Sequence, residues 1–217
     1  MDLRDIELQT ELGSLIGRLA MPASGPAFAL TVSRFHKVAA QDRASRRGIR
    51  RLIKPANAGI IVPHLPLVAG ERTHCALRGD FVLCDIIPAI IQARGRCPDL
   101  LIATLGLSTA NAEVLGSLRS RDLVGKLTIV CSHYFAQVDK ATTYREVKTR
   151  LQGLATIITT RCHAKVICLP TASGDHFVLE GSSNLRSSDN TEQLVIFNDA
   201  ELDAFHRGWL TSLPSHD

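Results

Sequence analysis

The sequence predicts an α/β protein whose mostly parallel or mixed central sheet is flanked by helices on both faces. From residue 79 onward, short apolar runs typical of strands alternate with stretches of helical periodicity. These runs are apolar without interruption, as in parallel strands that are buried on both faces. A chain of 217 residues, 45% hydrophobic and 21% charged, is also long enough to bury the core of such a fold.

The elements of this sheet are expected in a regular order. The apolar runs predict strands at residues 79–86, 99–105, 126–131 and 155–159. Helices are predicted between them at residues 88–94, 108–119 and 142–151. Pro88 suits the first turn of a helix, and Ser108 suits the N-cap position of the next one.

The last third of the chain predicts a different connectivity. Strands are expected at residues 164–169, 177–180 and 192–197, with no long helix between them. The first two should form a hairpin turned by residues 171–175, so this part of the sheet is expected to be antiparallel. A helix at residues 202–213 should close the chain.

Residues 1–70 are expected to form a helical and basic extension before the domain at residues 71–217. An amphipathic helix is predicted at residues 3–19. Residues 34–54 then carry eight basic side chains against the single acidic Asp42, namely Arg34, Lys37, Arg43, Arg46, Arg47, Arg50, Arg51 and Lys54. Such a run is either a solvated helix face or mobile arm, or an arm that binds phosphates.

Several classes of protein and site are disfavoured by the sequence. No apolar run reaches the roughly 18 residues of a membrane-spanning helix, and the N-terminus has no secretory pattern, so we expect a cytoplasmic protein without a membrane partner. The six cysteines form no CxxC pair, and we expect reduced, mostly buried thiols. A zinc site would need ligand pairs at short spacing, and two pairs come near, Cys162 with His163 and His74 with Cys75. Adjacent residues on a strand point to opposite faces, so no metal site is expected.

One segment near residue 163 carries candidate chemistry. His163 and Lys165 are two residues apart on a predicted strand, so both side chains project from the same face. An imidazole nucleophile beside a fixed positive charge suits a phosphate. The alternative is a satisfied core histidine and a lysine that protects an edge strand.

A second polar segment follows about 15 residues later. Gly181 would let the backbone approach a ligand closely, while Ser182 and Asn184 add short donors. Glu192 could orient an imidazole by accepting its second N–H. Taken alone, residues 181–184 would be an ordinary turn.

The ordered set of HxK, GSxN and a later glutamate resembles the phospholipase D superfamily, in the branch whose chains carry one such motif. The strand and helix alternation from residue 79 onward is similar more loosely. The resemblance implies a catalytic domain at residues 71–217 that needs no metal or other cofactor. It implies that His163 attacks phosphorus to form a phosphohistidine, while Lys165 and Asn184 stabilise the phosphoryl oxygens. Ser182 and Gly181 would line the site, and Glu192 would hold the imidazole.

The chain contains no second HxK from which another histidine could come. Similar one-motif enzymes pair two copies about a two-fold axis, so the resemblance implies a homodimer with one shared active site. The family's motif aspartate would fall at Pro170, and Asp175 or Glu180 could supply a carboxylate in its place. His133 follows a predicted strand where ligand crevices open in such sheets, and it is a candidate for the rim of the site.

We therefore predict a metal-independent phosphodiesterase that acts on nucleic acid, as a DNA endonuclease. A net charge of +4 and the basic stretch with Arg46, Arg47, Arg50 and Arg51 favour nucleic acid over lipid. The alternative is a phospholipase D-like module that binds DNA and has lost turnover together with its aspartate. A phospholipid hydrolase is a third reading, for which the sequence shows neither an export signal nor an apolar entry surface.

Overall fold

The computed structural model of the protein describes residues 49–53, 57–77, 81–139, 141–186 and 190–216. The chain divides into two compact units, Met1–Arg47 and Gly48–Asp217, and every described residue belongs to the second unit. The predicted helix at residues 3–19 lies outside the described residues, as do Arg46 and Arg47.

The described residues form a mixed sheet of eight strands, ordered β1-β2-β8-β7-β6-β3-β4-β5. The strands are β1 (Ile49–Ile53), β2 (Arg72–Leu77), β3 (Cys97–Thr104), β4 (Val124–Ser132), β5 (Thr156–Thr160), β6 (Val166–Pro170), β7 (His176–Gly181) and β8 (Glu192–Asn198). β3, β4 and β5 pair in parallel, whereas β6, β7 and β8 pair antiparallel with their neighbours. The predicted α/β class with a mixed sheet is confirmed.

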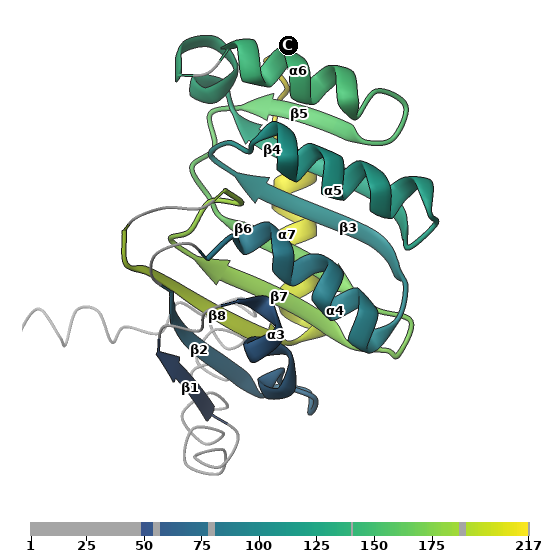
Figure 1. Ribbon diagram of the computed structural model, residues 1–217, viewed down its shortest axis with the longest axis vertical. Coiled ribbons are helices and arrows are strands. Elements are labelled where there is room, and N and C mark those ends of the chain that lie inside the picture. Colours follow the sequence, from purple (N-terminus) through teal and green to yellow (C-terminus); the bar gives the residue numbers. More distant parts are fainter. Residues whose placement is uncertain (1–48, 54–56, 78–80, 140, 187–189, 217) are drawn as a thin grey trace, which may run out of the picture. The chain divides into compact units, whose positions relative to one another are not determined.

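Helices cover both faces of this sheet, as Figure 1 shows. On one face lie α3 (Ala58–Ile61), α4 (Ile86–Arg94), α5 (Thr109–Ser120) and α6 (Ala141–Arg150), and on the other lies α7 (Ala200–Thr211). Two 3₁₀ turns are η1 (Val62–His64) and η2 (Leu83–Asp85), and a turn of π-helix is η3 (Phe135–Asp139).

Strand β3 shows why the central strands are apolar throughout. Leu100 and Ile102 are buried in the core under α4 and α5, while Leu101 and Ala103 are buried in the second core under α7. Because successive side chains of a strand point to opposite faces, a strand covered on both sides needs apolar residues at every position.

Two local signals act as the sequence predicts. The Ser108 hydroxyl accepts a hydrogen bond from the Asn111 amide, and the Asn111 side chain accepts one from the Ser108 amide, so α5 begins with a reciprocal capping box. The β6–β7 hairpin turns at residues 171–175, where the Thr171 amide donates to the Asp175 carbonyl. Gly174 has a φ of 86°, a conformation that side chains with a Cβ disfavour.

The strand predicted at residues 79–86 is wrong. Residues 83–85 form η2, and helix α4 begins at Ile86, two residues before Pro88. Proline is tolerated there because the amides of a first helical turn have no partner within the helix. A short buried apolar run has no periodicity that separates a strand from a helix, which explains the error.

The sheet also begins earlier in the chain than the domain boundary we expected near residue 70. Strand β1 at residues 49–53 pairs in parallel with β2, and both belong to the same unit as the rest of the sheet. Arg50 and Arg51 therefore lie on an edge strand of the sheet, with their backbones opposite Thr73 and His74. Charged residues are typical of edge strands, where they discourage pairing with other chains.

Candidate active site

The candidate site residues meet at one edge of the sheet because of how the strands pair. Val166, the first residue of β6, lies opposite Ala103 near the end of β3 and opposite Glu180 near the end of β7. Gly181 in turn lies opposite Leu194, close to the start of β8. The segments that carry the HxK, GSxN and Glu elements are thus brought to the same edge, although they are far apart in the sequence.

His163 and Lys165 lie in the segment that leads into β6, and the strand itself begins at Val166 rather than at the predicted residue 164. The two side chains nevertheless meet. Lys165 Nζ lies 3.1 Å from His163 Nδ1 and donates to the His163 carbonyl at 3.0 Å. The imidazole is exposed and the lysine is half-buried, so the pair faces solvent.

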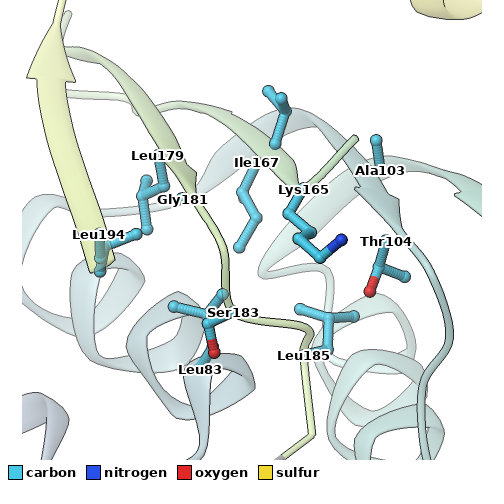
Figure 2. Close-up of a pocket in the computed structure, with 11 residues that line it drawn as sticks. Leu83, Ala103, Thr104, Lys165, Ile167, Leu179, Gly181, Ser183, Leu185 and Leu194 are labelled. Carbon is cyan, nitrogen blue, oxygen red and sulfur yellow. The ribbon is translucent and has the colours of Figure 1, made fainter. Parts of the chain in front are cut away.

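The surroundings of Lys165 act on its charge in opposite directions. Burial lowers the pKa of the Lys165 ammonium, and the nearby Glu192 carboxylate offsets part of that effect. A cavity of about 10 Å³ beside the lysine is bounded by Thr104, Ser183 and Leu185, and Figure 2 shows the lysine reaching from the start of β6 toward Thr104. Such a cavity holds about one water molecule, so the substrate must bind outside it.

Ser182 and Glu192 form a pair of their own. The Ser182 hydroxyl donates to Glu192 Oε2 and accepts from the Gln193 amide, and the Ser182 amide donates to the Gln193 carbonyl. We expected Glu192 to hold the imidazole, but among the described residues His163 Nδ1 contacts Lys165 instead. The Glu192 carboxylate is close enough to Lys165 to raise the pKa of its ammonium.

Gly181 allows the backbones of β7 and β8 to approach closely. A Cβ added to Gly181 would lie 2.2 Å from the Gln193 carbonyl oxygen, a distance that no real contact allows. We expected the missing side chain to make room for a ligand, but the space is taken by β8. Close approach of two backbones is the other standard reason for a glycine within a strand.

Asn184 is held in place by the end of β3. Its Oδ1 accepts from the Leu105 amide at 3.1 Å and from the Thr104 hydroxyl at 3.4 Å. These contacts fix the carbonyl side of the amide, and its NH₂ group has no partner among the described residues. A donor of this kind at the sheet edge is available to an anionic oxygen.

The other histidine that the sequence singled out lies on the same edge but apart from the pair. His133 follows directly on β4, whose last residue Ser132 lies opposite Thr160 of β5. Its ring packs edge-on against His216 at a centroid distance of 5.9 Å, and its Nδ1 is buried without a hydrogen-bond partner among the described residues. The structure thus places His133 in contact with His216, and its role at the rim of the site stays a prediction.

The two candidate replacements for the motif aspartate have different positions. Asp175 lies at the far end of the hairpin, beside the end of β6 that carries Pro170, and it binds Arg94, Ser173 and Asn198. Glu180 binds His206 of α7 at 2.5 Å, on the other face of the sheet. Neither carboxylate contacts His163.

The described residues contain no cluster of three or more His, Cys, Asp or Glu side chains that could hold a metal ion. All six cysteines are free and only Cys162 is not fully buried. Burial raises the pKa of the Cys75 thiol to about 11, so this thiol stays protonated. In the same described part of the chain, no helix is both long and apolar enough to cross a membrane.

Comparison with known proteins supports the fold. No family model matches the sequence, and no curated protein matches it. Among solved structures, NucT from Helicobacter pylori is similar with a TM-score of 0.50 and 16% identity, over 66% of this chain and 94% of that one. A phospholipase D family member, Nuc from Salmonella typhimurium, is similar with a TM-score of 0.43 and 17% identity, over 58% of this chain and 84% of that one. The described sheet and helices therefore have a fold similar to that of NucT, an α/β architecture of the kind that the sequence predicted.

Proposed function

We propose that the chain is a phosphodiesterase that cleaves nucleic acid, with DNA as its substrate. The observation that carries the proposal is the contact of 3.1 Å between Lys165 Nζ and His163 Nδ1, at an edge where Asn184 presents an amide donor. An exposed imidazole beside a fixed ammonium suits attack on a phosphodiester, because the ammonium neutralises the charge on the phosphoryl oxygens.

The reaction uses His163 as the nucleophile. A ring nitrogen attacks phosphorus, the bond to the leaving oxygen breaks, and a phosphohistidine forms that water then hydrolyses. A bound phosphate oxygen replaces the imidazole as the acceptor for Lys165, which frees Nδ1 of His163. The Asn184 amide donates to a second oxygen, so this chemistry calls for no metal ion.

The leaving oxygen must receive a proton, and a second histidine is suited to supply it. His133 contacts His216 rather than the His163 pair, so it does not fill this role in one chain. A two-fold homodimer would present a second copy of His163 to the same phosphate.

The charge of the chain supports nucleic acid as the substrate. The net charge is +4, and the basic stretch includes Arg46, Arg47, Arg50 and Arg51.

The direct test is a search for the covalent intermediate. Wild type and His163→Ala are mixed with plasmid DNA in EDTA, denatured at high pH because phosphohistidine is labile in acid, and weighed intact by mass spectrometry. We expect cleavage and an adduct in wild type, and a loss of about 10³-fold or more in rate for His163→Ala. His64→Ala is the matched control, since His64 lies before β2 and outside the candidate site.

The replacement of the motif aspartate by Pro170 favours one alternative, a module that binds DNA without cleaving it. In that case no cleavage and no adduct form, and His163→Ala leaves affinity unchanged. Neutralising Arg46, Arg47, Arg50 and Arg51 would then flatten the salt dependence of the dissociation constant, by about 0.9 in logarithmic slope for each phosphate that the protein no longer neutralises. That combination of results would overturn the enzyme proposal.

A further inference from the structure

A groove of about 470 Å³ lies next to the candidate site and has no role in the chemistry above. It is lined by the start of α5 and by α6, together with Arg186, which follows the GSxN segment. We call it the edge groove and define it by Leu107, Thr109, Thr143 and Arg186. Its volume is within the range of sites that hold a small molecule or one nucleotide, about 300–1,000 Å³.

Two short stretches of backbone run from the candidate site to the edge groove. Arg186 is two residues after Asn184, and Leu107 is two residues after Leu105, whose amide holds the Asn184 side chain. Two residues of chain span at most about 7 Å. A substrate strand with its scissile phosphate at His163 would therefore bring its next nucleotide to the groove.

The walls of the edge groove combine the chemical groups that a nucleotide requires. Arg186 supplies a guanidinium, and the hydroxyls of Thr109 and Thr143 are further donors. Val82, which is half-buried, adds apolar surface to the wall. The first turns of α5 and α6 contain no acidic side chain, so their amides add positive potential there.

Glu146 also lines the edge groove, one helical turn after Thr143. Its carboxylate would oppose a phosphate and weaken its binding, although Arg186 has the opposite sign. A variant without the Glu146 charge therefore separates two kinds of ligand. It should bind a ligand that carries a phosphate more tightly, and it should bind a ligand held through its amino groups more weakly.

We propose that the edge groove binds the nucleotide adjacent to the scissile phosphate, with Arg186 on the phosphate of that nucleotide. This inference rests on the proposed function, because it assigns a position to the substrate strand of that reaction. It makes Arg186 and Thr143 determinants of substrate binding, and it predicts that nucleic acid is bound over more than one phosphate.

The test measures binding in the absence of turnover. Each variant is made in the His163→Ala protein, and the dissociation constant of a fluorescein-labelled oligonucleotide is measured by anisotropy at fixed salt. Arg186→Ala should raise it about tenfold, as expected for the loss of one charge-assisted hydrogen bond. Ala110→Phe, at an exposed position of the groove wall, should raise it similarly by steric exclusion, and Glu146→Gln should lower it.

Two matched controls lie on α5 and just after it, away from the groove. Ser117→Phe places the same ring on an exposed position of that helix, and Arg121→Ala removes a cation beyond its end, so neither should change the dissociation constant. Unchanged binding in both Arg186→Ala and Ala110→Phe would overturn the groove assignment, as would weaker binding in Glu146→Gln. If binding responds but wild type never cleaves DNA, the groove assignment stands and the phosphodiesterase proposal fails. If wild type cleaves DNA but binding does not respond to the groove variants, the phosphodiesterase proposal stands and the groove assignment fails.

Discussion

The two ends of the β6–β7 hairpin differ in how their polar side chains are buried and paired. At the open end, His163 is exposed, Lys165 is half-buried, and the Asn184 amide has an unused donor among the described residues. At the turn, Asp175 is buried and binds Arg94, Ser173 and Asn198. The polar groups at the open end face solvent, whereas those at the turn are hydrogen-bonded within the protein.

The largest expected effect concerns the open end. Lys165→Ala should lower kcat by about 10²–10³-fold, because the site loses the charge that stabilises the phosphoryl oxygens. The midpoint of thermal unfolding should change little, since within the described part of the chain the ammonium hydrogen-bonds only to His163. Lys126→Ala is the control: its ammonium is exposed, lies 3.8 Å from Asp99, and should affect neither quantity. A large loss of stability in Lys165→Ala would show that the two ends do not differ as described.

The second effect concerns the turn. Asp175→Ala should lower the free energy of unfolding by about 2–3 kcal/mol, because it leaves Arg94 and Asn198 without their acceptor. Activity of the folded fraction should persist, since Asp175 does not contact the candidate site residues. Urea denaturation gives the stability, and cleavage assays at low temperature give the activity. A complete loss of activity in a folded variant would mean that Asp175 takes the part of the motif aspartate in the chemistry.

The pH dependence of stability provides a check on the same carboxylate. Burial alone would raise the pKa of Asp175, but hydrogen bonds from Arg94, Ser173 and Asn198 outweigh it and hold the pKa below its usual value. A carboxyl whose pKa is lowered by folding stabilises the protein above its unfolded pKa of about 3.9, and this stabilisation is lost as the pH falls through the folded value. The difference in unfolding free energy between wild type and Asp175→Ala should accordingly shrink below about pH 4.

The smallest effect separates two glycines. Gly181→Ala should cost about 1–3 kcal/mol and reduce activity, because the new methyl group would displace the Gln193 carbonyl and with it the Ser182–Glu192 pair. Gly208→Ala is the control: apart from the nearby backbone of its own helix, no described atom lies within 4 Å of the added Cβ, and this helical position should gain about 0.5–1 kcal/mol. Both variants are compared by thermal unfolding and DNA cleavage. Equal behaviour would contradict the tight contact between β7 and β8.

Local patterns in the sequence predicted much of this fold. Ser108 and Asn111 lie within one turn of each other, so their reciprocal cap can be read directly, and the turn at residues 171–175 is equally local. The sequence did not predict strands β1 and β2, because basic and polar residues such as Arg50 and Arg72 interrupt their apolar pattern. Their place in the sheet follows from pairing with each other and with β8, which is distant in the sequence. The edge groove has no sequence signal, since its walls come from separate segments of the chain.

The sequence by itself determined that His163 and Lys165 lie close together, because one residue separates them and their backbones cannot be far apart wherever the segment lies. Only the tertiary structure decided what surrounds them. The pairing of Ser182 with Glu192, the Leu105 amide on Asn184 and the Gln193 carbonyl against Gly181 all depend on strand register. Register between distant segments is set by how whole faces pack, and local spacing does not contain that information.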